Sequence, residues 1–267
     1  MGLSRSDNGR GAIGVFDSGV GGLTVFREIA RALPRESLIY LGDSARVPYG
    51  TKSPSTVVRY ALEAARHLLG RNVKMLVVAC NTATAAALPA LKEQLSIPVI
   101  GVVEPGARAA VERTSGVVGV IATEGTVRAK AYTNAIHALD PDIEVIESAA
   151  PLFVPLAEEG WANTHVAREV AEIYLEPLID AGIDTLVLGC THYPILRGTI
   201  EQVVGNAVHI VDSAETTALV VKQALGASGA TGEPRYEFLV TDAEERFRRI
   251  AGEFLERDID HLELVAL

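Results

Sequence analysis

Short apolar runs rich in valine, isoleucine and leucine alternate with longer amphipathic stretches along most of the chain. The short runs are continuously apolar, which is typical of strands buried on both faces of a parallel sheet. The helical pattern is clearest over residues 54–69, where Ser53 suits the N-cap and Pro54 the first helical position. We expect strands at 13–16, 38–41, 73–78, 99–102, 117–121, 144–146, 185–188, 208–211 and 237–240. This alternation predicts an α/β protein with mostly parallel sheets flanked by helices.

A weak internal repeat relates two parts of the chain. Residues 14–18 read Gly-Val-Phe-Asp-Ser, and 105 residues later residues 119–123 read Gly-Val-Ile-Ala-Thr. The only two cysteines, Cys80 and Cys190, are separated by a similar offset of 110 residues. Any two α/β units look alike at the level of one strand, but two features at nearly the same offset favour a repeat. We therefore expect two pseudo-symmetric α/β domains that meet at the carboxyl ends of their strands, with the site in the cleft between them.

No low-complexity linker separates the two domains, so we place the chain crossings near residues 103–106 and 211–213. The predicted boundaries are 1–103 plus 212–267 for a discontinuous first domain, and 104–211 for the second. The last helical pattern has four apolar residues on one face, Phe247, Ile250, Phe254 and Leu255. We expect that face to pack against the first domain and the opposite face, rich in Glu and Arg, to be solvated.

Composition narrows the function classes. Hydrophobic residues make up 48% of the 267 and charged residues 22%, as in ordinary soluble proteins. A formal net charge of −10 without a clustered basic stripe argues against nucleic-acid binding. No apolar run approaches the roughly 20 residues of a membrane span, and the polar start at residues 1–11 lacks a signal-peptide pattern. We expect a cytoplasmic protein whose cysteines stay reduced.

Both cysteines lie between a short apolar run and a helical pattern. Cys80 precedes an Asn-Thr pair, and Cys190 precedes a Thr-His pair. A free thiol has a pKa of about 8.5, and the N-terminus of a helix lowers that value by favouring the thiolate. We therefore expect the backbone to help ionise both thiols. A lone buried cysteine is usually just a small apolar side chain, but two facing, uncrosslinked thiols suit cofactor-free inversion of a carbon centre.

A glycine-rich turn follows the first expected strand, over residues 17–24. The dinucleotide-binding pattern needs a glycine where Thr24 stands, and no Gly-Lys-Ser/Thr ending makes this turn a phosphate loop. Asp17 would also place a negative charge where a pyrophosphate has to lie. The carboxylate of Asp17 and the hydroxyl of Ser18 suit a ligand ammonium group instead, and a capping aspartate in a tight turn is the structural alternative.

Three further places carry candidate polar groups. His192, two residues after the second cysteine, could exchange a proton with that thiol or with a nearby carboxylate, although Cys-x-His is not a zinc spacing. Tyr49 and Gly50 follow the second expected strand and could present a phenol and backbone N–H groups to a ligand. Glu158 and Glu159 form a carboxylate pair before a turn, which from their pattern alone we expect to be a solvated loop.

Four motifs occur in order along nearly the whole chain. They are Gly-Val-Phe-Asp-Ser-Gly-Val-Gly-Gly-Leu-Thr at 14–24, Asp-Ser-Ala-Arg-Val-Pro-Tyr-Gly at 43–50, Ala-Cys-Asn-Thr-Ala at 79–83 and Gly-Cys-Thr-His-Tyr-Pro at 189–194. With them the chain closely resembles the glutamate racemases of the aspartate/glutamate racemase family. The resemblance implies two pseudo-symmetric domains and a cofactor-independent interconversion of L- and D-glutamate that supplies D-glutamate for peptidoglycan. It also implies a homodimer.

The resemblance further implies a two-base mechanism, in which one thiolate removes the α-proton and the opposite thiol donates one. Cys80 would act on D-glutamate and Cys190 on L-glutamate. An assisting glutamate maps to Glu158 or Glu159, with Glu158 favoured. The implied catalytic residues are Cys80, Cys190, Asp17, His192 and Glu158. The implied substrate-binding residues are Asp17, Ser18, Tyr49, Gly50, Asn81, Thr82, Thr123, Thr191 and His192.

The alternative is a racemase of the same superfamily that acts on aspartate or another amino acid. Aspartate racemases resemble Cys-Thr-Glu where this chain has Cys-Thr-His at 190–192, and a decarboxylase of this fold retains one cysteine rather than two. Pyridoxal-dependent racemisation needs a lysine, and no lysine lies within a motif. A two-domain solute-binding protein has no need of matched thiols. We expect no cofactor, no metal, and no nucleic-acid or membrane partner.

Overall fold

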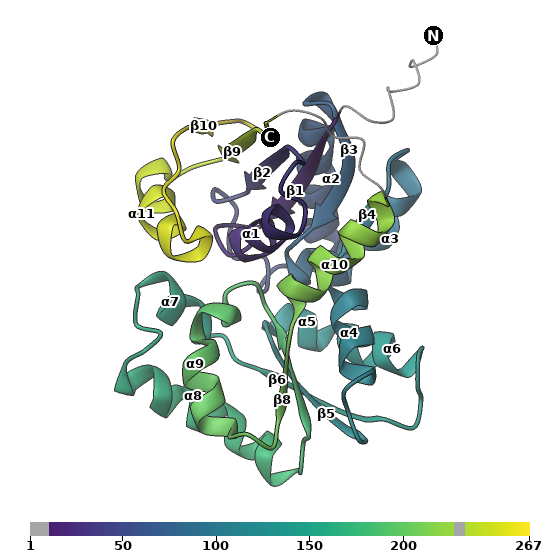
Figure 1. Cartoon of the computed structure of the whole chain (residues 1–267), viewed down its shortest axis with the longest axis vertical. Helices are drawn as coiled ribbons and strands as arrows, with labels where there is room; N and C mark the ends of the chain where they lie inside the picture. The colour runs from purple at the N-terminus through teal and green to yellow at the C-terminus, as the bar shows by residue number, and fades with distance from the viewer. Residues whose placement is uncertain (1–10, 227–232) are drawn as a thin grey trace.

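The computed structural model describes residues 11–226 and 233–267, which form two parallel sheets, one above the other in Figure 1. The first sheet has the strand order β10-β9-β2-β1-β3-β4. Its strands are β1 (Ala12–Asp17), β2 (Leu38–Gly42), β3 (Val73–Val78), β4 (Val99–Gly101), β9 (Tyr236–Val240) and β10 (Leu262–Leu264). The expectation about a signal peptide concerns residues 1–10 above all, and these lie outside the described residues.

The second sheet has the strand order β6-β5-β7-β8. Its strands are β5 (Val117–Ala122), β6 (Glu144–Ala149), β7 (Thr185–Gly189) and β8 (His209–Asp212). Counted from the start of each half, the first four strands of both sheets follow the same order, 2-1-3-4. β5 is therefore the counterpart of β1, and β7 that of β3. This shared topology, with parallel pairing throughout, confirms the predicted fold class.

Helices cover both faces of the first sheet because its strands are apolar on both sides. Ile13 and Val15 of β1 pack in one buried cluster with Phe26, while Phe16 packs in a second cluster with Val57. The helices on the first of these faces are α1 (Leu23–Ala32) and α11 (Glu244–Leu255), and α2 (Pro54–Gly70) and α3 (Asn81–Gln94) pack on the other. The second half contains α4 (Val103–Val111), α5 (Glu124–Arg128), α6 (Ala131–His137), α7 (Phe153–Glu158), α8 (His165–Asp180), the 3₁₀ helix η1 (Tyr193–Leu196) and α9 (Arg197–Val204).

The start of α2 agrees with the sequence prediction. Ser53 is its N-cap and accepts a hydrogen bond from the Thr56 N–H, and Pro54 occupies the first helical position. This side chain satisfies one of the unpaired N–H groups at the helix start, while proline has no N–H that needs a partner.

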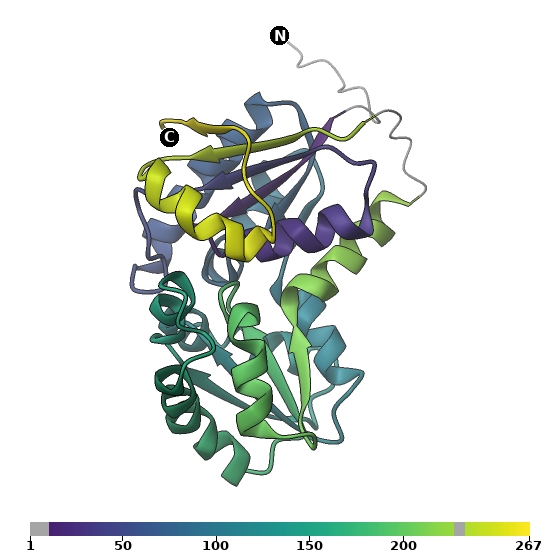
Figure 2. The same ribbon diagram turned by 60° about the vertical axis from the view of Figure 1, so that its left-hand side comes forward.

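The chain crosses between the two halves twice. It leaves the first sheet after β4 and enters α4, and it returns from β8 through α10 (Ser213–Leu225), which packs against α1 and α4. Figures 1 and 2 show α10 running obliquely from the second sheet toward the first. Because α10 contacts elements of both halves, the exact domain boundaries stay a prediction.

Two strands differ from the sequence prediction. β10 was not expected, since three residues at the sheet edge are too few to show a periodic pattern. β6 extends to Ala149 rather than residue 146, because Glu147 and Ser148 interrupt the apolar run but still pair with β5. No helix in the described part of the chain is long and apolar enough to span a membrane.

Candidate active site

The candidate residues lie at the carboxyl ends of matched strands. Asp17 ends β1, Cys80 follows β3, Thr123 follows β5 and Cys190 follows β7. Contacts between the halves bring these ends together, and the hydroxyl oxygens of Thr82 and Thr123 are 2.8 Å apart. Both thiols are free, and each cysteine is only 6% exposed. This is the edge at which open α/β sheets bind ligands.

Cys80 is the N-cap residue of α3. Its Sγ accepts a hydrogen bond from the Ala83 N–H at 3.4 Å and donates one to the Ser18 hydroxyl at 3.5 Å. Burial raises the pKa of this thiol to about 12; the Asp17 carboxylate acts in the same direction, and the contacts with Ser18 and Ala83 act against it. The backbone at the helix N-terminus acts to lower the pKa of Cys80, as expected, but loss of hydration outweighs this contribution and the net shift is upward. Cys80 is a neutral thiol at pH 7.

Asp17 is a buried carboxylate with one free oxygen. Its Oδ2 accepts a 2.8 Å hydrogen bond from the Gly19 N–H, while its Oδ1 is buried without a partner among the described residues. Burial raises the pKa of Asp17, and the positive charge of His192 opposes that rise. A buried oxygen in need of a donor suits the ammonium group that the sequence suggests for this turn.

Cys190 begins a chain of polar contacts. Its Sγ lies 3.9 Å from His192 Nδ1, and His192 Nε2 lies 3.0 Å from Glu158 Oε1. Burial disfavours the charged imidazolium, but the contacts with Cys190 and Glu158 raise the pKa of His192 to about 10. The helix expected directly after Cys190 is instead the short 3₁₀ helix η1. The imidazolium is therefore the charged group that lies beside this thiol.

Glu158, rather than Glu159, is the carboxylate that reaches His192. It is the last residue of α7 and its side chain is 16% exposed, so the expected solvated loop is wrong for this residue. The side chain of Glu159 is 51% exposed, and its Oε1 lies 3.4 Å from Arg246 Nη2. Burial raises the pKa of Glu158, but the hydrogen bond and charge of His192, together with the charge of Arg246, bring it below the usual value.

The Asn81 side chain links the Cys80 turn to the second half. Its Oδ1 accepts a 2.8 Å hydrogen bond from the hydroxyl of Tyr132 on α6, and its Nδ2 is buried without a partner in the described part of the chain. The aromatic ring of Tyr132 also touches the turn before Cys190, since a Cβ on Gly189 would lie 2.9 Å from it. Tyr132 thus contacts both thiol-bearing turns, and no sequence motif indicated it.

The Tyr49–Gly50 loop packs differently from the expectation. The Tyr49 hydroxyl donates to the buried carboxylate of Asp43, which also accepts a 2.6 Å hydrogen bond from Arg46. The hydroxyl hydrogen of Tyr49 is therefore engaged within the protein, and only its oxygen can accept a hydrogen bond from a ligand. Gly50 approaches the other half so closely that a Cβ there would lie 3.0 Å from the Cβ of Thr123.

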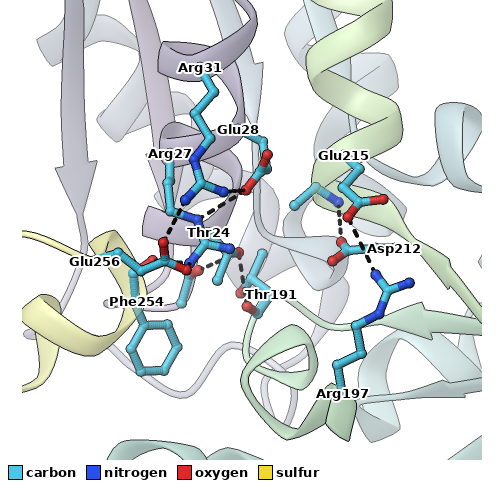
Figure 3. A network of polar contacts seen from close by, with 12 residues as sticks. Thr24, Arg27, Glu28, Arg31, Thr191, Arg197, Asp212, Glu215, Phe254 and Glu256 are labelled. Atoms are coloured by element: carbon cyan, nitrogen blue, oxygen red, sulfur yellow. Dashed lines mark hydrogen bonds and ion pairs between the residues drawn. The ribbon is translucent and has the colours of Figure 1, made fainter. Parts of the chain in front are cut away.

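The glycine-rich turn of the first half packs directly on the Cys190 turn. The Thr24 hydroxyl donates a 3.0 Å hydrogen bond to the carbonyl oxygen of Thr191, as Figure 3 shows. A Cβ on Gly21 would lie 2.4 Å from both Thr191 Oγ1 and His192 Nδ1. The glycine-rich turn therefore packs against the His192 side chain, and it also carries Asp17 and Ser18.

The described residues contain no group of three or more His, Cys, Asp or Glu side chains arranged to hold a metal ion. The polar groups that this site offers are thiols, carboxylates, hydroxyls, an amide and an imidazole. Such groups can bind an ammonium and a carboxylate and can move a proton on either side of a bound molecule.

Comparisons with known proteins agree with this geometry. The family model described as Asp/Glu/Hydantoin racemase matches residues 13–221. A glutamate racemase from Geobacter metallireducens is 55% identical over 249 residues, which cover 91% of this chain and 92% of that protein. The structure of a glutamate racemase isoform from Bacillus anthracis matches with a TM-score of 0.93 at 43% identity, over 97% of this chain and 98% of the other.

Two more solved structures show that this chain is close to a glutamate racemase and distant from an aspartate racemase. Glutamate racemase from Francisella tularensis in complex with D-glutamate matches with a TM-score of 0.90 at 39% identity, over 96% of this chain and 97% of the other. An aspartate racemase from Picrophilus torridus has a TM-score of 0.58 at 19% identity, over 80% and 94%, which is a likeness of fold alone. The chain therefore belongs to the Asp/Glu/Hydantoin racemase family and, within it, to the glutamate racemases.

Proposed function

We propose that this protein interconverts L- and D-glutamate with Cys80 and Cys190 as its two acid/base groups. The observation that carries the proposal is the placement of two buried free thiols after equivalent strands of two similar halves. Each thiol has its own ionisable neighbour, Asp17 for Cys80 and His192 for Cys190. The activity of the close relatives and the D-glutamate in the Francisella tularensis structure support glutamate as the substrate.

The pKa of Cys80 and the neighbour of Cys190 suggest how L-glutamate reacts. With its pKa raised to about 12, Cys80 is the proton donor, and Cys190, whose Sγ lies 3.9 Å from His192 Nδ1, is the base. Cys190 then removes the α-proton and Cys80 protonates the opposite face of the carbanion. D-glutamate requires the reverse arrangement, with Cys80 ionised and Cys190 protonated. Because an amino acid α-proton is only weakly acidic, fixed dipoles and exclusion of water must lower much of the barrier.

Two unpaired polar groups suit the charged ends of the amino acid. The free Oδ1 of Asp17 is a buried acceptor for the ammonium. The free Nδ2 of Asn81 is a buried donor at the start of α3, where backbone N–H groups also favour an anion, so this place suits a carboxylate. Thr82, Thr123 and Thr191 add hydroxyls around the same turns. Substrate binding would thus satisfy groups that are left without partners in the free protein.

The test is circular dichroism of the pure protein with L-glutamate and, separately, L-aspartate, with no added cofactor. We expect only the glutamate signal to decay, and decay of the aspartate signal instead would replace the substrate with that of the alternative. Cys80→Ser and Cys190→Ser should each reduce racemisation by at least about 100-fold while the far-ultraviolet spectrum stays that of a folded protein. Wild-type rates in either of these two variants would exclude the two-thiol mechanism. In addition, the product that the wild-type protein forms in deuterium oxide should carry deuterium at the α-carbon.

We also propose that the protein works in the cytoplasm as a homodimer and supplies D-glutamate for peptidoglycan. The support is the family resemblance, together with two reduced thiols in the proposed chemistry. Light scattering after size-exclusion chromatography should give twice the 28.3 kDa chain mass. Expression should allow a bacterium that requires D-glutamate to grow without it, and the Cys190→Ser variant should not.

A further inference from the structure

The final helix, α11, contacts the Cys190 side of the site although it lies beside the first sheet. The ring of Phe254 meets the imidazole of His192 edge-on, with centroids 5.3 Å apart and an interplanar angle of 79°. Two turns earlier, Arg246 Nη2 donates a 2.8 Å hydrogen bond to Glu158 Oε2. One helix therefore touches both His192 and the carboxylate that holds it. The sequence pattern had assigned the charged face of this helix to solvent.

Arg246 and His192 hold opposite oxygens of the same carboxylate. Glu158 Oε1 lies 3.0 Å from His192 Nε2, and Glu158 Oε2 lies 2.8 Å from Arg246 Nη2. Hydrogen bonds between charged groups are short and directional, so two of them fix the carboxylate plane. With Arg246 removed, the carboxylate could rotate about its side-chain bonds and carry the imidazole with it. Only His192, and not Arg246, lies within reach of the Cys190 thiol.

The helix that carries Arg246 is itself anchored at its end. Arg27 of α1 donates to the carbonyl oxygen of Phe254 at 3.2 Å and to Glu256 Oε1 at 2.6 Å, and Arg31 donates to Glu256 Oε2 at 2.5 Å. Figure 3 shows this network beside the Thr24–Thr191 contact. In Figure 1, α11 lies over α7, whose last residue is Glu158. Arg246 is thus presented to Glu158 from a helix fixed to α1.

We propose that Arg246 is a positioning residue for racemisation, which fixes Glu158 so that His192 keeps its Nδ1 against the thiol of Cys190. The inference rests on the proposed two-thiol mechanism. Arg246 lies on α11, which packs on α1 and β10 beside the first sheet, whereas Glu158 ends α7 in the half that contains the second sheet. The ion pair therefore also makes the orientation of His192 depend on the approach of the two halves, which no contact within the second half alone could do.

The primary variant is Arg246→Gln, with Arg249→Gln as its matched control. Arg249 lies on the same helix and its charge also lowers the pKa of Glu158, but among the described contacts it forms no hydrogen bond to that residue. We expect Arg246→Gln to lower kcat about fivefold, the upper range for a half-exposed ion pair, with KM within about twofold of wild type. Arg249→Gln should stay within about twofold in both constants. Equal losses in the two variants would mean that only the charge of the helix matters, and would overturn the proposal.

A double-mutant cycle tests whether Arg246 acts through Glu158. In a Glu158→Gln background, Arg246→Gln should cause no further loss, whereas in a Glu159→Gln background the full fivefold loss should remain. A fivefold loss in both backgrounds would overturn the proposal, and so would an unimpaired Arg246→Gln single variant. Slow variants are followed by deuterium entry into glutamate over long incubations. Cys190→Ser is assayed alongside: if it is active, the two-thiol mechanism itself fails, and if it is inactive, the Arg246 results are judged independently.

Discussion

A methyl group at Gly21 should separate the two halves of the site by about 1 Å. The new Cβ would lie 2.4 Å from His192 Nδ1 and 2.5 Å from His192 Cε1, whereas ordinary van der Waals contact begins at 3.4 Å. Gly21 does not have a positive φ, so alanine brings no backbone strain, and the effect comes from the contacts of the new Cβ with His192 and with Thr191 Oγ1, which would also lie 2.4 Å away. Either the imidazole turns away from Cys190 or the glycine-rich turn withdraws from it. A misplacement of about 1 Å at catalytic groups costs about 100-fold in rate.

The Gly21→Ala variant is assayed by circular dichroism in both directions. L- and D-glutamate have equal free energies in water, so kcat/KM must fall by the same factor for both enantiomers, which provides an internal check. Overpacking of this kind should also lower the free energy of unfolding by about 1–3 kcal/mol. Gly198→Ala is the control, because Gly198 lies on α9 and a Cβ added there would have nothing within 4 Å. This variant should keep full activity, and its free energy of unfolding should be unchanged or slightly higher. A Gly21→Ala rate within threefold of wild type would refute the reasoning.

Two further predictions concern protonation and hydrogen bonding. The pKa of His192 rises from 6.5 to about 10 on folding, so its contribution to stability is complete below pH 6.5 and is lost as the pH rises toward 10. Urea unfolding should therefore show the free energy of unfolding falling more steeply with pH over this range in wild type than in His192→Gln. Equal pH dependence in the two proteins would contradict this prediction. Tyr132→Phe removes the only donor to Asn81 Oδ1 among the described contacts, and it should lower the free energy of unfolding by about 1–3 kcal/mol. The control is Tyr174→Phe, which should lower it by less than about 0.5 kcal/mol, because the Tyr174 hydroxyl only accepts a hydrogen bond from an exposed backbone N–H.

The fold was predictable because its main signal is local. Continuously apolar runs such as those of β1 and β3 are written in consecutive residues, and so is the cap that Ser53 provides for α2. The two thiol positions were predictable for a related reason, since the repeat places each cysteine after the third strand of its half. Features that depend on one strand and the turn after it can be read from the sequence in this way.

The parts that sequence reasoning missed depend on contacts between distant segments. Arg246 and Glu158 are 88 positions apart, and Tyr132 and Asn81 are 51 apart, so no local pattern joins either pair. The raised pKa of Cys80 has the same origin, because the N-terminus of α3 is visible in the sequence but the burial that outweighs it depends on the surrounding fold. The charged face of α11 likewise predicts exposure to solvent, but a helix from a distant part of the sequence can pack beside such a face, as α7 does here.

The two chain crossings limit how the halves can move. One crossing enters α4 and the other enters α10, and these helices pack against each other, with α10 also reaching β4. A single connection would let one half rotate freely relative to the other. Two neighbouring connections instead define an axis, and bending of the halves about that axis is then the easiest motion. Cutting the backbone at one crossing would keep the halves tethered yet remove that axis. The path of the chain thus makes bending about this axis the easiest way to bring the two thiols closer together or farther apart.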